Sequence, residues 1–258
     1  MKLGKKPATP SRVRPMRDLL GLHGAGKIAP PVPAGADWSQ HVSAWPMLDN
    51  DQVGDCTIAA VGHAAQCWTA AAGDQRLMTD AEAVSGYELF GYVPGDESTD
   101  QGANAQDVLT RWTTPGFAVG GQQDVLTGFC AIDTQDDSEV RAGVAWLGVV
   151  YAGVALPLGV QGADAWDCGP LEPNGAPVDG PWAVGSWGGH AIVIVGYSPN
   201  GLLCITWGKT LWMTWPFWRT YADEAYGLLS RDFSSAAIPA EAWGTLEGDM
   251  ADLRSAVH

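Results

Sequence analysis

Cysteine and histidine are the side chains of this sequence best suited to nucleophilic and general-base chemistry, and the chain has five of each. A cysteine reacts as its thiolate, and the positive end of a helix dipole lowers the pKa of a cysteine at a helix start. Cys56 opens the alanine-rich, proline-free stretch 56–72, with Asp55 placed to cap it and Gly73 placed to stop it. Cys56 is therefore the candidate nucleophile.

An imidazole from a distant segment can accept the thiol proton and return it to a leaving group. His190 directly precedes the apolar run 191–197, which is typical of a buried strand. His63 lies seven residues beyond Cys56 on the same helix, about 10 Å along its axis, and cannot reach the sulfur. The other histidines lie in or near the first segment or at the terminus: His23, His41 and His258. His190 is therefore the candidate base.

The remaining cysteines show no metal or redox pattern, because they are scattered and form no CxxC pair. We interpret them as inert packing residues, with at least one free thiol, in a protein assembled in a reducing cytoplasm: Cys67, Cys130, Cys168 and Cys204. The acidic residues Asp96, Glu97 and Asp100 lack the spacing of an EF-hand and are read as capping residues. The sequence predicts no metal and no cofactor.

The first half of the chain is predicted to be mainly helical and the second half mainly β. Helices are expected at about 16–22, 56–72, 79–91, 103–112 and 215–223. The helix at 56–72 is apolar or small on both faces, so it should run through the core. Buried strands are expected at 147–156, 191–197 and 202–207, with a turn at 198–201 joining the last two as a hairpin, and a final apolar run covers 225–229.

Charge divides the chain into a basic first segment and an acidic remainder. Seven of the 14 basic residues precede residue 28, with Asp18 as the one acid there, and the rest holds 7 basic and 28 acidic residues. Residues 1–36 read as an extended, proline- and glycine-rich arm, which either folds back on its own body or docks on an acidic partner. Residues 37–258 read as one domain, with a helical lobe at 37–135 and a β lobe at 136–258.

The net charge of −15 argues against nucleic-acid binding, and no apolar run is long enough for a secretory signal or a membrane span. The 13 tryptophans could form a glycan platform. Many of them flank the strands predicted around His190, so packing of the core and cleft walls is the simpler interpretation.

Two segments resemble motifs of the papain family: 50–56, which leads into the long helix, and 188–197, which contains His190. Residues 206–208 are similar to the Ser-Trp-Gly that follows the family's third catalytic residue, and 147–156 resembles the strand before its substrate pocket. The resemblance implies an α+β papain-like fold, with a Cys-bearing helix in one lobe and an antiparallel β lobe. It also implies Cys56 as nucleophile and His190 as base.

The same resemblance places Asn50 where the family has its oxyanion glutamine, with Gln52 as a second amide donor. It puts Ile205 where the family has an orienting asparagine, and Val53 where a disulfide cysteine usually stands. The nearest groups that could orient the imidazole instead are the hydroxyl of Thr206 and the carboxylates of Asp223 and Glu224. The candidate catalytic residues are thus Cys56, His190, Asn50 and Thr206.

Segments 3–8, 54–56, 99–102 and 213–218 further resemble papain-like proteins encoded by tailed phages of actinobacteria. This implies a virion-associated cysteine peptidase or amidase that acts on a peptide or a peptidoglycan peptide. The alternative is a structural virion protein, of the tail or capsid, with a weakened or inactive site and an arm that anchors it to other virion proteins. Either protein is expected in the virion after assembly in the host cytoplasm, with no nucleic-acid or membrane partner.

Overall fold

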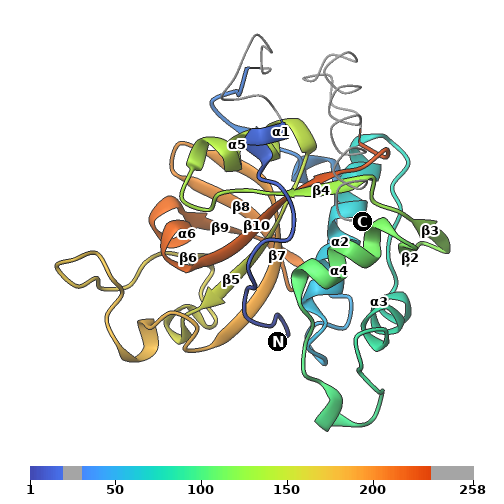
Figure 1. The fold of residues 1–258 in the computed structure, drawn as a ribbon, viewed down its shortest axis with the longest axis horizontal. Helices are drawn as coiled ribbons and strands as arrows, with labels where there is room; N and C mark the ends of the chain where they lie inside the picture. The colour runs from blue at the N-terminus through green and yellow to red at the C-terminus, as the bar shows by residue number, and fades with distance from the viewer. Residues whose placement is uncertain (20–30, 234–258) are drawn as a thin grey trace.

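A computed structural model describes residues 1–19 and 31–233 of the chain. Two lobes lie side by side: one contains α2, α3 and α4, and the other contains a large sheet with α5 and α6 (Figure 1). The helices are α1 (Met16–Leu19), α2 (Cys56–Ala71), α3 (Asp80–Glu88), α4 (Ala105–Thr113), α5 (Asp137–Leu147) and α6 (Trp215–Tyr221). Short 3-10 turns cover Ser39–His41, Glu97–Thr99, Leu158–Val160 and Gly180–Trp182.

The β lobe is built on one sheet whose strands run in the order β4-β10-β5-β7-β8-β9-β6, with β1 paired to β7. The strands are β1 (Ala36–Asp37), β4 (Gly128–Ala131), β5 (Val150–Leu156), β6 (Ala165–Trp166), β7 (Gly188–Ser198), β8 (Gly201–Thr206), β9 (Lys209–Thr214) and β10 (Ala222–Leu229). All neighbours pair antiparallel except β6 and β9. A separate ribbon joins β2 (Phe117–Val119) to β3 (Gln122–Asp124).

The α2 helix joins the two lobes, as its two apolar faces predict. Every residue from Cys56 to Thr69 is buried. The Trp68 indole donates to the Leu147 carbonyl at 2.8 Å, and the Tyr151 hydroxyl of β5 donates to the Thr57 carbonyl at 3.0 Å. The Tyr151 bond fixes the first turn of α2, and with it Cys56, against β5, and the Trp68 bond ties the last turns of α2 to the end of α5.

Several element boundaries differ from the sequence prediction. The expected strand at 147–156 begins only at Val150, because α5 extends to Leu147 and Gly148, with φ of +81°, ends it. Strand β9 had no prediction. The helical patch at 215–223 ends at Tyr221, so Asp223 and Glu224 lie in β10, within the sheet. Asp55 occupies the N-cap position of α2 but makes no capping hydrogen bond with its side chain.

Two other predictions, the hairpin and the capping role of Asp96, are confirmed. Strands β7 and β8 form the expected hairpin across the turn at 198–201. Asp96 caps the 3-10 turn at 97–99 by accepting the Ser98 N–H at 3.0 Å. Within residues 1–19 and 31–233, no helix is both long enough and apolar enough to cross a membrane.

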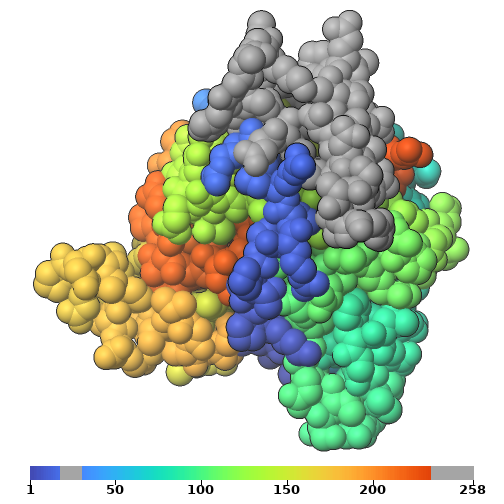
Figure 2. Space-filling view, in the orientation of Figure 1, coloured from blue at the N-terminus to red at the C-terminus, as the bar shows by residue number. Residues whose placement is uncertain are grey.

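The arm lies along its own body over its described part, residues 1–19. In Figure 2 it runs as a continuous ridge between the helical and β lobes. Its basic side chains pair with acids of the body: Lys2 with Asp100 at 3.8 Å, Arg12 with Asp107 at 2.7 Å and Arg17 with Asp133 at 3.4 Å. Basic residues of the arm therefore form ion pairs with acidic residues of the same chain, as expected for an arm that folds back on its own body.

Candidate active site

Cys56 is the first residue of α2 and is 1% exposed. The loop that leads into it is held from the helical lobe, because Asp100 accepts the Gly54 N–H at 3.0 Å. The Cys56 sulfur accepts the backbone N–H of Ala191 at 3.3 Å, so the helix start lies directly against β7. The thiol therefore lies between the two lobes and contacts Ala191, the residue that follows His190 in the sequence.

His190 is buried near the start of β7, and its ring is fixed by Thr206, the last residue of β8, and by Trp207, which follows it. Its Nε2 atom and the Thr206 hydroxyl oxygen are 2.8 Å apart. The Trp207 indole stacks on the imidazole, with ring centroids 4.1 Å apart and planes 13° apart. The β7–β8 hairpin thus supplies both the histidine and the groups that orient it.

The structure brings Thr206, rather than the other candidates, to the imidazole. Ile205 is buried in the apolar core opposite Val193 of β7. Asp223 and Glu224 bind the Lys5 ammonium. Thr206 therefore occupies the position where an orienting partner is required.

The two amide candidates for an oxyanion donor are engaged elsewhere in this state. The Asn50 amide donates to the Val53 carbonyl at 3.2 Å and is buried, so it stabilises the loop before α2. The Gln52 amide donates to the Asp51 carboxylate at 2.7 Å on the surface. An oxyanion role for Asn50 remains a prediction.

His63 lies away from Cys56, as its position further along the same helix predicts. Its Nε2 atom is 2.8 Å from the Pro46 carbonyl oxygen, and its ring packs edge-on against Trp45. Burial lowers its pKa to about 4, so it is neutral at pH 7. It is a packing histidine.

Cys56 and His190 are both neutral in this structure. Burial raises the pKa of the Cys56 thiol to about 12, although backbone hydrogen bonds from Ala191 and Gly4 oppose the rise. Burial lowers the pKa of His190 to about 3. The Nδ1 atom of His190 is buried without a hydrogen-bond partner, so the hydrogen bond between this ring and the thiol is not formed.

The arm lies in the cleft between the two lobes, beside Cys56. The Lys5 N–H donates to the Gly189 carbonyl of the β lobe at 3.1 Å. On the other side, Ala103 donates its N–H to the Gly4 carbonyl at 2.8 Å and accepts the Lys6 N–H at 3.0 Å. An extended segment of the arm therefore pairs by its backbone with both walls of the cleft.

Glycines make this close approach possible. A Cβ atom on Gly4 would lie 1.6 Å from the Gly54 carbonyl oxygen, and one on Gly102 would lie 2.0 Å from the Gly4 carbonyl oxygen. Further along, the Trp207 indole donates to the Lys2 carbonyl at 3.1 Å. The same tryptophan that stacks on His190 thus holds the arm, and the arm covers the site.

Sequence reasoning did not predict that the arm fills the cleft. The signals present were Gly4 in the arm and glycines at 54, 102 and 189, each of which allows backbone to approach backbone. Only the fold shows that these four positions converge.

The fold, with its Cys-bearing central helix and antiparallel β lobe, is that of the papain-like cysteine proteases. Xylellain, a cysteine protease from Xylella fastidiosa, superposes with a TM-score of 0.62 at 14% identity, over 88% of this chain and 96% of that chain. The Carica candamarcensis cysteine protease CMS1MS2, solved with E-64, gives 0.55 at 14% identity, over 77% and 99%.

Digestive procathepsin L 3 of the Tenebrio molitor larval midgut gives a TM-score of 0.53 at 13% identity, over 77% of this chain and 70% of that chain. No protein-family model and no curated protein matches the sequence. The likeness therefore lies in the fold and not in detailed sequence.

Proposed function

We propose that this chain is a papain-like cysteine peptidase whose cleft is closed by its own N-terminal arm. The observation that supports the proposal most strongly is the arrangement around His190: Thr206 on Nε2, Trp207 on the ring face, and a buried Nδ1 without a partner next to the Cys56 helix start. A buried polar atom without a partner costs about 1–3 kcal/mol, and such costs are typical of working sites. In a peptidase, this free nitrogen would be the acceptor for the thiol proton.

In the proposed reaction, a peptide replaces residues 4–6 of the arm and pairs with the backbones of Ala103 and Gly189. Thr206 accepts the Nε2–H of His190, which leaves Nδ1 free to take the thiol proton. The Cys56 thiolate then attacks the carbonyl carbon, and the pair of electrons of the C=O bond moves onto oxygen. The Cys56 backbone N–H, at the first position of α2, donates to that oxygen, with the Asn50 amide as a second donor.

The tetrahedral intermediate collapses when its C–N bond breaks and the His190 imidazolium gives its proton to the departing amine. This leaves an acyl thioester on Cys56. Water attacks the thioester with His190 again as base, the C–S bond breaks, and the carboxylic acid product and free thiol are restored. Opening of the cleft also lets water reach both groups, which removes the burial that keeps them neutral.

Thr206 provides a test of this arrangement. In a variant with an opened cleft, Thr206→Val should lower kcat/KM about 10- to 100-fold, because the imidazolium loses the acceptor that orients it. Thr206→Ser keeps the hydroxyl and should restore most of the activity. Peptide hydrolysis measured alongside thermal unfolding separates this effect from a loss of stability. Equal activity of the Val and Ser variants would show that Thr206 does not position His190.

A second candidate function is a structural virion protein that keeps the fold without catalysis. The filled cleft favours it, since an arm that pairs with both walls serves equally well as a structural clamp. For either function, virion association and contacts of the arm with other virion proteins are part of the proposal and rest on the resemblance to phage proteins. Two results together would assign the structural function. The protein would stay inactive after its cleft is opened, and deletion of residues 1–35 would prevent its incorporation into the virion.

A further inference from the structure

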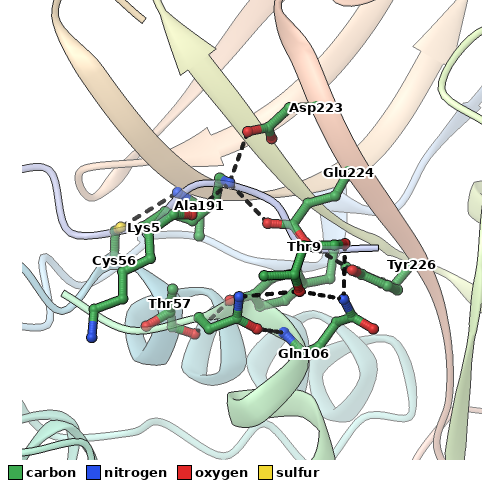
Figure 3. A network of polar contacts seen from close by, with 12 residues as sticks. Lys5, Thr9, Cys56, Thr57, Gln106, Ala191, Asp223, Glu224 and Tyr226 are labelled. Atoms are coloured by element: carbon green, nitrogen blue, oxygen red, sulfur yellow. Dashed lines mark hydrogen bonds and ion pairs between the residues drawn. The ribbon is translucent and has the colours of Figure 1, made fainter. Parts of the chain in front are cut away.

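The cleft contains an acidic pocket that is filled by a lysine. The Lys5 side chain is fully buried, and its ammonium group donates to Asp223 at 2.9 Å, to Glu224 at 2.8 Å and to the Lys6 carbonyl at 3.0 Å. Figure 3 shows the side chain reaching from the Cys56 side of the cleft to both carboxylates. All three N–H groups of the ammonium are thus satisfied.

The Glu224 carboxylate of this pocket has a second partner besides Lys5. Both carboxylates lie on β10, next to β5 in the sheet, and the Glu224 carboxylate also accepts the Tyr226 hydroxyl at 2.7 Å. The side chain of Glu224 is 6% exposed and that of Asp223 is 26% exposed. If the arm left, a largely buried carboxylate would lose its counter-charge, and a buried charge without a partner is costly. An emptied pocket therefore favours a new cation.

The shape of the pocket fits an unbranched side chain. Gly153 of β5 forms its wall, and a Cβ atom there would lie 2.5 Å from the Lys5 Cε atom and 2.7 Å from both the Asp223 Oδ1 and Glu224 Cγ atoms. A glycine at this position leaves room for the lysine stem. The compact ammonium matches two carboxylates and one carbonyl, whereas a planar guanidinium is longer and needs a different arrangement of acceptors.

We propose that Gly153, Asp223 and Glu224 form a specificity pocket for a lysine side chain of the peptide that the cleft accepts, and that Lys5 occupies this pocket in the closed state. The inference builds on the proposed peptidase function by naming its substrate class. Lys5 adjoins Gly4, whose backbone contacts Cys56, so the lysine of a bound peptide would lie close to the peptide bond that is attacked.

Binding tests the pocket without any need for catalysis. The full chain carrying Gly4→Val, Lys5→Met and Cys56→Ser has a displaced arm, an empty pocket and no nucleophile. The probe is a dye-labelled peptide with the sequence of residues 1–9, and fluorescence anisotropy gives its Kd. A peptide with Lys5→Met should bind at least about tenfold more weakly, as expected when one partner of a buried charge pair is lost.

The chain offers a charge-matched control, because Lys6 is an exposed neighbour of Lys5. A peptide with Lys6→Met carries the same net charge as the Lys5→Met peptide and should bind within about threefold of the parent. Equal weakening by the two changes would overturn the pocket and indicate general attraction to an acidic body. A peptide with Lys5→Arg that binds as tightly as the parent would overturn the assignment to lysine.

Two changes on the protein complete the design. Neutral carboxamides in Asp223→Asn/Glu224→Gln should reduce the preference for lysine over methionine to below about threefold. Gly153→Ala keeps both carboxylates but places a methyl group where the lysine stem lies, so it should reduce the preference for lysine to the same extent. It serves as the test if the double variant does not fold. A preference that survives Gly153→Ala would overturn the proposal. With Cys56 restored, selective lysine binding without hydrolysis would reject the peptidase function alone, and hydrolysis without lysine preference would reject the pocket alone.

Discussion

The Gly4→Val variant should react with iodoacetamide at Cys56 about 30-fold faster, or more, than the unaltered protein at pH 7.5. A side chain at position 4 overlaps the Gly54 carbonyl oxygen, whose backbone cannot move without displacing the start of α2. The arm segment must therefore leave the cleft. A 30-fold acceleration corresponds to a loss of about 2 kcal/mol in the free energy that holds the arm in the cleft. The ion pairs of Lys5, a residue that leaves the cleft together with Gly4, alone contribute about that much.

Two physical changes contribute to the expected acceleration. The sulfur, now 1% exposed, becomes accessible to the reagent. Water also reaches the thiol and the imidazole, so the burial that raises the Cys56 pKa and lowers the His190 pKa is relieved. A larger thiolate fraction at pH 7.5 follows from both shifts.

Lys6→Val is the matched control, because it places the same β-branched side chain two positions away on an exposed part of the arm. It should label at the rate of the unaltered protein. Mass spectrometry of peptic fragments assigns the label to Cys56, and Cys168, which is half-buried outside the cleft, reports on general unfolding. Equal labelling rates for Gly4→Val and Lys6→Val would mean that the arm does not cover the thiol.

The second large effect is expected on catalysis itself. In the Gly4→Val background, Cys56→Ser should lower peptide hydrolysis at least about 10³-fold, because a serine hydroxyl at this position lacks the acidity that lets a thiol ionise beside an imidazole. His190→Ala should cause a loss of similar size, since the two residues act as one unit. Their combination should cost little more than either change alone.

Cys168→Ser is the control for Cys56→Ser, because it makes the same atomic replacement in a thiol that contacts Thr220 and lies outside the cleft. It should leave hydrolysis within about twofold of the parent. Hydrolysis of lysine-containing and lysine-free peptides by the Gly4→Val parent and these four variants provides the measurement. Activity that persists in Cys56→Ser would assign the chemistry to another group and reject the proposed mechanism.

The positions of Cys56 and His190 could be predicted from local sequence, since a small-residue helix and an apolar strand are strong patterns. The partner of the imidazole could be narrowed only to Thr206, Asp223 or Glu224. The choice depends on the register of β8, because a shift of one residue decides which side chain faces the imidazole and which faces the core. Ile205 takes the core side opposite Val193, and this leaves Thr206 at the ring. This register is set by the pairing of β8 with β7 and β9, and local sequence patterns do not predict it.

The arm in the cleft could not be predicted, because its contacts join residues 1–6 to segments that begin about fifty positions away and extend to β10. The buried pair of Lys5 with Glu224 is the clearest case, as a lysine in a proline-rich basic segment is normally solvated. Helix α5 was missed for a different reason. Its first turn is acidic and reads as a polar loop, although Asp136 caps it by accepting the Ser138 N–H at 2.9 Å.

The central claim is that Cys56 and His190 form a nucleophile–base pair in a cleft that the arm closes. The most direct test is mass spectrometry of the protein after exposure to a lysine-containing peptidyl epoxide, a reagent that an activated cysteine opens by attack on a ring carbon. The account predicts one stoichiometric adduct on Cys56 in Gly4→Val, and none on the same time scale in Gly4→Val/His190→Ala or in the unaltered protein. Absence of the adduct in Gly4→Val, with the protein folded and Cys56 open to iodoacetamide, would contradict it.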